Sequence, residues 1–88
     1  MRLQMAKPWN AVIAETIHIA DQYIDAFGLS KEMWEPRTHA ESPAGKLYHR
    51  IVVIRPHWRV TPEQYTAFHE QAAPWMRRVA PDGHFKII

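Results

Sequence analysis

The chain has 88 residues, enough for a single domain with one core, and its apolar fraction of 47% is typical of a folded globular protein. It contains no cysteine, which excludes disulfides, thiolate metal sites and cysteine nucleophiles. The net charge of +2 is too small for a dedicated nucleic-acid-binding protein, although residues 29–60 hold six basic and only three acidic side chains.

Residues 8–27 have the pattern of one long amphipathic helix. Apolar side chains fill about half of a helical wheel that starts at Trp9, and polar side chains fill the other half. Pro8 suits the first helical turn, and Gly28 can adopt the left-handed conformation that ends a helix. Before this helix, residues 1–7 are expected to be a flexible end or to include a short strand at residues 2–5.

The next segment has few apolar residues and many turn formers. Ser30 can cap a short turn that Pro36 then stops. Residues 36–45 have no hydrophobic period and are therefore predicted to be a surface loop.

Residues 47–55 are predicted to form a strand, because their centre, residues 51–54, is β-branched throughout. A period of two places one set of side chains on one face, namely Tyr48, Arg50, Val52 and Ile54, and the remaining side chains on the other. Both faces are apolar at the middle of the strand. It therefore needs cover on both sides, from two helices or from a second chain.

A second helix is predicted to begin after Thr61. Threonine at the N-cap, proline next and Gln64 at the third helical position together form a capping box. Pro74 lies within the helical pattern, so we expect a kink or a short break there. Residues 81–83 should form a turn, and residues 84–88 alternate well enough to be a final short strand.

These elements follow in the order α-β-α-β. The sequence therefore predicts an α+β domain of residues 1–88, with two amphipathic helices packed on a small two- or three-stranded sheet. Dimerisation is one way to complete such a sheet, since two strands alone make a poor one. If the last two strands are parallel, they form a β-α-β unit with the second helix.

No pattern of residues indicates catalysis or a cofactor. His18, Asp21 and Asp25 share one helical face at a spacing that could hold a metal ion, but a solvated helix face explains the same residues. Ser30 and Ser42 lack the surroundings of a nucleophile, and Gly45 is not part of a phosphate-binding loop. We therefore expect no catalytic residue, no metal site and no cofactor, with a small metal-dependent enzyme as the remote alternative.

The basic and aromatic side chains around the central strand are the best candidates for binding. Tryptophan beside arginine is typical of interface hot spots, which favours Arg55, His57, Trp58 and Arg59 as a contact surface. Arg50, Lys46 and His49 on the strand could extend it.

The expected function is that of an accessory or inhibitor protein that binds a protein surface or another copy of itself. Nucleic-acid binding by the basic segment 46–59 is the alternative. No apolar run approaches the roughly 18 residues of a membrane span, and the start of the chain does not resemble a signal peptide. We therefore expect a cytoplasmic protein without a membrane partner.

Overall fold

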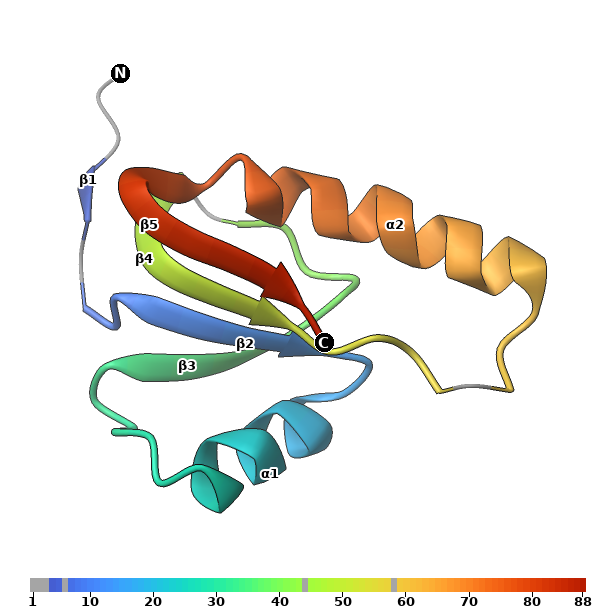
Figure 1. Cartoon of the computed structure of the whole chain (residues 1–88), viewed down its shortest axis with the longest axis horizontal. Helices are drawn as coiled ribbons and strands as arrows, with labels where there is room; N and C mark the ends of the chain where they lie inside the picture. The colour runs from blue at the N-terminus through green and yellow to red at the C-terminus, as the bar shows by residue number, and fades with distance from the viewer. Residues whose placement is uncertain (1–3, 6, 44, 58) are drawn as a thin grey trace.

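The computed structural model of the chain describes residues 4–5, 7–43, 45–57 and 59–88. Seven elements follow one another along the chain: β1 (Gln4–Met5), β2 (Asn10–Ala14), α1 (Ile17–Ala26), β3 (Trp34–Thr38), β4 (Lys46–Val53), α2 (Pro62–Met76) and β5 (Val79–Ile87). Four of the strands form an all-parallel sheet in the order β3, β2, β4, β5, and β1 adds a two-residue pairing at the start of β4 (Figure 1). The fold is therefore α/β, and the predicted α+β class with two or three strands is wrong.

The main error concerns residues 8–27, which do not form a single helix. Residues 10–14 are the central strand β2, and only residues 17–26 are helical. A strand buried on both faces is apolar at nearly every position and therefore does not show the alternation of a half-buried strand. On a helical wheel its residues simply add to the apolar side, so the pattern predicts one continuous helix. The boundary is set by Thr16, whose hydroxyl oxygen accepts a hydrogen bond from the backbone N–H of Ile19 at 3.1 Å.

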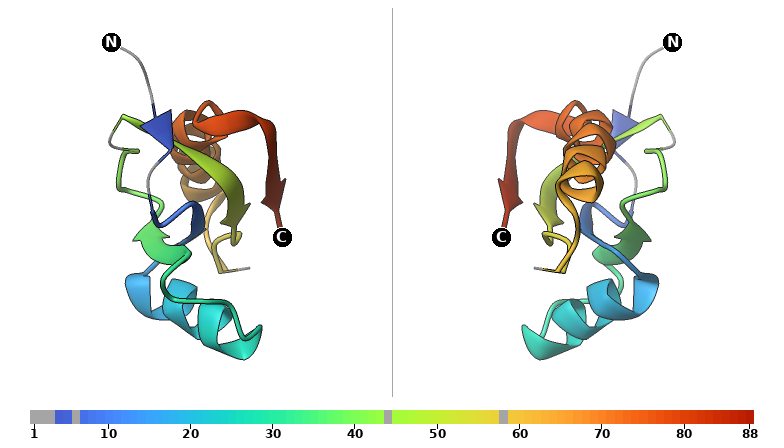
Figure 2. Two further views of the ribbon diagram at one scale, coloured as in Figure 1. Left: turned by 90° about the vertical axis from the view of Figure 1, so that its left-hand side faces the viewer. Right: turned by 90° about the vertical axis from the view of Figure 1, so that its right-hand side faces the viewer.

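The two helices cover opposite faces of the sheet. Val12 and Ala14 of β2 pack against Ala20 and Ile24 of α1. The alternate residues of β2 belong to the other hydrophobic cluster, which includes Ala11, Ile13, Tyr48, Ile51, Val53, Phe68, Ala72 and Trp75. Figure 2 shows the result from the side, with β2 and β3 between α1 and α2. No helix in the described part of the chain is long and apolar enough to cross a membrane.

Part of the predicted loop 36–45 is the edge strand β3. Pro36 lies in the middle of this strand, and an edge position tolerates proline because one side of the strand has no partner. From β3 the chain crosses over β2 to reach β4 without an intervening helix. This crossover lies on the α2 face, where the indole N–H of Trp75 donates to the carbonyl oxygen of Glu41 at 3.2 Å.

Strand β4 and its neighbour β5 depart from regular pairing near their starts. Tyr48 pairs with Val79 and Arg50 pairs with His84, so β5 advances five residues while β4 advances two. The predicted turn 81–83 is the extra length within β5. The irregularity also breaks the predicted alternation of β4, because Tyr48 packs on the same side as Ile51. Strands β4 and β5 are parallel, so they form the predicted β-α-β unit with α2.

Helix α2 confirms the capping box. The Thr61 hydroxyl accepts from the backbone N–H of Gln64, and the Gln64 side chain accepts from the backbone N–H of Thr61 at 2.8 Å. The predicted break at Pro74 does not occur, since α2 continues through this residue to Met76. Only the last turn follows Pro74, and the fully buried Trp75 holds that turn against the sheet.

Candidate functional site: a groove beside α1

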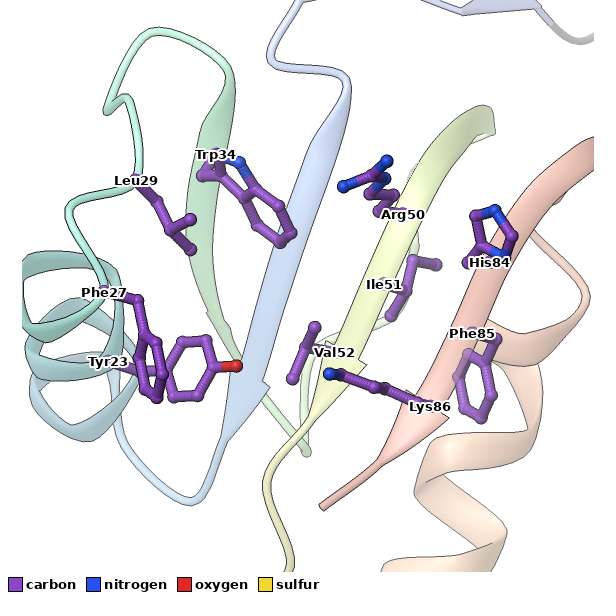
Figure 3. Close-up of a pocket in the computed structure, with 10 residues that line it drawn as sticks. All are labelled: Tyr23, Phe27, Leu29, Trp34, Arg50, Ile51, Val52, His84, Phe85 and Lys86. Atoms are coloured by element: carbon purple, nitrogen blue, oxygen red, sulfur yellow. The ribbon is translucent and has the colours of Figure 1, made fainter.

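The α1 face of the sheet carries a groove of about 500 Å³, here called the α1-side groove. It lies over β4, with α1 on one side and β5 on the other (Figure 3). Its lining consists of Tyr23, Phe27, Leu29, Trp34, Arg50, Ile51, Val52, His84, Phe85 and Lys86. The groove exists because α1 packs against β2 and β3 and leaves this face of β4 and β5 without a helix.

The wall next to α1 is aromatic. The rings of Tyr23 and Phe27 lie one helical turn apart, with their centroids 4.4 Å from each other. Phe27 is 65% exposed, the largest exposure among the large apolar side chains of the described residues. Leu29 and Trp34 extend this wall toward β3 in Figure 3. Phe27 is exposed and the other three side chains are half-buried, so the wall offers apolar surface of the kind that binding sites on small proteins use.

The opposite wall and the floor supply positive charge. On β5, the period of two turns Phe85 and Ile87 toward the α2-side cluster and leaves His84 and Lys86 in the groove. The Lys86 side chain extends from β5 across β4 in the direction of α1, and Arg50 extends from β4 toward β2 (Figure 3). No ion pair joins either cation to a carboxylate of the described residues, and no carboxylate lines the groove.

The side-chain oxygen of Asn10, at the start of β2, is a buried hydrogen-bond acceptor beside the groove. Asn10 pairs in register with Trp34 on one side and with Arg50 on the other, and both of these residues line the groove. Asn10 is 9% exposed, and its side-chain oxygen forms no hydrogen bond with the described part of the chain. A buried polar atom without a hydrogen bond is uncommon in folded proteins, and a bound partner is one way to satisfy it.

Of the predicted binding residues, Arg50 lines the groove and His49 borders it. The rings of His49 and His84 meet edge to face, with centroids 6.2 Å apart. Lys46 belongs to a different environment on the α2 face. Its ammonium donates to the carbonyl oxygen of Pro8 at 2.8 Å and lies 3.5 Å from the carboxylate of Glu35. Lys46 therefore supports the fold and does not contribute to the groove.

Glu35 is the centre of a partly buried polar network beneath the crossover. Its carboxylate accepts from the hydroxyl of Tyr48 and from the guanidinium of Arg37, at 2.9 Å for the latter. Burial favours the neutral acid, but the two hydrogen bonds and the charge of Lys46 outweigh it, so the pKa of Glu35 lies below its ordinary value. Burial, together with the Glu35 carboxylate, raises the pKa of the Tyr48 hydroxyl.

The predicted surface 55–59 lies at the other end of the sheet. Arg55 follows the end of β4, roughly 16 Å along the strand from Arg50. The backbone N–H of His57 donates to the carboxylate of Glu15, and the His57 ring accepts from the backbone N–H of Arg59 at 3.2 Å. Trp58 lies outside the described residues. The predicted set is thus divided among the groove, the α2 face and the carboxyl ends of the strands.

Most residues of the groove were missed by sequence reasoning. The helical pattern assigns Tyr23 and Phe27 to the buried face of a long helix, and Trp34 falls in a predicted turn. A usable signal was present in residues 84–88, whose alternation separates His84 and Lys86 from Phe85. It identifies an exposed basic face of the last strand, although it cannot show that α1 leaves that face uncovered.

No cluster of three or more metal-ligating side chains occurs in the parts of the chain that the structure describes. Comparison with known proteins adds no assignment, because no family model, no curated protein and no solved structure matches this chain.

Proposed function

We propose that this protein is a non-enzymatic binding module that holds an acidic amphipathic helix of a partner protein in the α1-side groove. The observation that carries the proposal is the pair of cations, Arg50 and Lys86, that face an aromatic groove without a carboxylate partner among the described residues. Binding of this kind is consistent with the accessory role expected from the sequence.

The position of the groove favours a helix as the bound element. One face of the sheet is covered by α2 and the crossover, whereas the other has α1 over β2 and β3 alone. Helices pack side by side at 8–10 Å, so a helix placed next to α1 would lie over β4 and β5. Such a helix would contact Phe27 and Trp34 with its apolar face, as amphipathic helices do in hydrophobic grooves.

The charges of the groove favour an acidic partner. Arg50 and Lys86 lie on the floor and the far wall, where acidic residues flanking the apolar stripe of a bound helix would meet them. Complementary charges of this type orient a partner and speed its association more than they raise affinity. The bound helix is therefore expected to carry glutamate or aspartate beside its leucines.

Nucleic-acid binding has less support. A continuous cationic surface along residues 46–59 would suit a phosphate backbone, but Lys46 is paired with Glu35 on the α2 face, and Arg50 faces the α1 side. The basic residues that the sequence brings together are thus separated in space.

The test uses a fluorescent model peptide of about four helical turns with leucines on one face and glutamates beside them. Fluorescence anisotropy measures its affinity for the wild-type protein and for the double variant Arg50→Gln with Lys86→Gln. We expect the double variant to raise Kd about 3- to 30-fold, which corresponds to two exposed ion pairs of about 0.3–1 kcal/mol each. The matched control is Arg55→Gln with Arg59→Gln, which removes the same charge from the carboxyl end of the sheet.

Three outcomes would contradict the proposal. The first is binding that depends on Arg55 and Arg59 but not on Arg50 and Lys86. The second is equal affinity for a peptide with lysines in place of the glutamates. The third is tight binding of a single-stranded oligonucleotide with no binding of the acidic peptide. Light scattering of the protein alone reports its oligomeric state. A dimer that dissociates in Arg50→Gln with Lys86→Gln would place a second copy in the groove and would be a fourth contradicting outcome.

A further inference from the structure

A second hollow of about 290 Å³ lies at the carboxyl ends of the parallel strands. Glu15 follows β2, His39 follows β3 and Pro56 follows β4, and all three line it. Helix α2 forms the remaining wall with Phe68 and Gln71. This hollow, here called the carboxyl-edge crevice, is separate from the α1-side groove and shares no residue with it.

The topology explains why a crevice forms at this place. From β2 the chain turns to α1 on one face of the sheet, and from the adjacent β4 it turns to α2 on the opposite face. Two neighbouring strands whose connections diverge leave a gap at their carboxyl ends. Open parallel sheets bind their ligands in gaps of this type.

One hydrogen bond fixes the tautomer of His39 and leaves its Nδ1 as a hydrogen-bond acceptor. Its Nε2 lies 2.8 Å from the carbonyl oxygen of Ile54. Because a carbonyl oxygen can only accept, Nε2 must carry the hydrogen, and Nδ1 of the neutral ring keeps its lone pair. Nδ1 forms no hydrogen bond with any residue that the structure describes. His39 is 7% exposed, and its ring packs against that of Phe68, with centroids 4.8 Å apart.

The other polar groups of the crevice also favour a ligand that donates hydrogen bonds. Glu15 is the one residue of the lining that is charged at neutral pH, and one of its carboxylate oxygens accepts from the backbone N–H of His57. Neither its second oxygen nor the amide of Gln71 forms a hydrogen bond with the residues that the structure describes. Val60 and Phe68 supply apolar surface beside them.

We propose that the carboxyl-edge crevice binds a small alkylammonium ligand, with the ammonium between Glu15 and Nδ1 of His39 and the alkyl chain against Val60 and Phe68. A primary ammonium has three N–H donors and one positive charge. These match the Nδ1 lone pair of His39, the amide oxygen of Gln71 and the Glu15 carboxylate. Burial lowers the pKa of His39, and this keeps the imidazole in the neutral form that accepts a hydrogen bond.

The experiment is a titration of the isotope-labelled full chain with n-butylammonium, followed by amide and imidazole NMR shifts. We expect saturable shifts at Glu15, His39 and Gln71 with a Kd of about 1–10 mM, the range open to a ligand this small. The 15N shift of His39 Nδ1 should move on binding, while the exposed ring of His84 in the α1-side groove should not respond. Glu15→Gln should weaken binding at least about fivefold, since one full charge is removed and the shape is kept.

The controls separate charge from shape. Glu70→Gln makes the same change on α2 outside the crevice and should leave the affinity unchanged. Equal binding of n-butanol, binding of n-butyrate, or unchanged affinity in Glu15→Gln would each overturn the proposal. The same holds if the shifts map to the α1-side groove. The helix-binding proposal is unaffected by any of these outcomes, because its peptide assay reads a different surface.

Discussion

Replacing Tyr48 with phenylalanine tests whether the partly buried network beneath the crossover stabilises the fold. Tyr48 is 2% exposed, so water cannot replace the hydrogen bond that its hydroxyl donates to the Glu35 carboxylate. A buried hydrogen bond to a charged group contributes about 1.5–3 kcal/mol. Arg37 and Lys46 still neutralise Glu35 in the variant, so the loss should not exceed this range. The expected decrease in the free energy of unfolding is therefore about 1.5–3 kcal/mol.

Urea denaturation at pH 7 measures the effect of Tyr48→Phe directly. With a slope of about 1.5 kcal/mol/M for a domain of this size, the midpoint should fall by about 1–2 M. Tyr65→Phe is the matched control, because Tyr65 lies exposed on α2 and should change the midpoint by less than about 0.3 M.

The pH dependence provides a second readout of the same network. The pKa of Glu35 is lower in the folded chain than its ordinary value, so its stabilising effect is present above that ordinary value, about 4.5. It is lost as the pH falls through the folded-state pKa. The difference between wild type and Tyr48→Phe should therefore be largest near pH 7 and shrink below about pH 4.5. A difference below about 0.5 kcal/mol at pH 7, or one that grows on acidification, would refute this reasoning.

Two further substitutions test other parts of the fold. Gly83→Ala should lower the free energy of unfolding, measured by urea denaturation, by about 1–3 kcal/mol, because an added Cβ would lie 2.7 Å from Val79 and still closer to the His49 carbonyl oxygen. Asp82→Ala is the control and should have little effect. A Gly83→Ala variant as stable as the wild type would contradict the close approach of β5 to β4 at this residue. Burial lowers the pKa of His39, so its contribution to stability should be complete at pH 7 and should decline as the pH falls below about 6.5, toward the lowered folded-state pKa. In urea denaturation, the midpoint of His39→Gln should fall less over this pH range than that of the wild type. An unchanged decline would show that another group causes it.

Local signals predicted the start of α2 accurately. Thr61, Pro62 and Gln64 lie within four residues of one another, and their capping interactions need no distant partner. Gly28 similarly ends α1 in the left-handed conformation, with φ of 62°. Features of this kind depend on neighbouring residues alone, so they can be identified before the fold is known.

The error at residues 8–27 has the opposite cause. Ala11, Val12, Ile13 and Ala14 are all fully buried, and nothing in such a run distinguishes a central strand from a helix. The decision is made by β3 and β4, which pair with β2 on its two sides. Those partners come from distant segments of the chain, one of which was predicted to be a loop.

The candidate site was predicted least well. Arg50 was selected from the sequence and does line the groove, but the grouping with Arg55 and Arg59 assumed that neighbours in sequence share a surface. In the parallel sheet, the two ends of β4 serve different surfaces. The residues that accompany Arg50 come from α1, β3 and β5, and only the sheet order brings them together.

By itself, the sequence determined the capped second helix and the doubly apolar centre of β4. These follow from propensity, capping and side-chain period, which act over a few residues. The cover predicted for both faces of β4 is present only on the α2 side. Only the tertiary structure decided that β2 is a strand, that the helices lie on opposite faces, and that β4 and β5 keep one face uncovered beside α1. The reason is physical: strand order and helix placement arise from hydrogen bonds and packing between distant segments, and the groove is the part of the sheet that this packing leaves open.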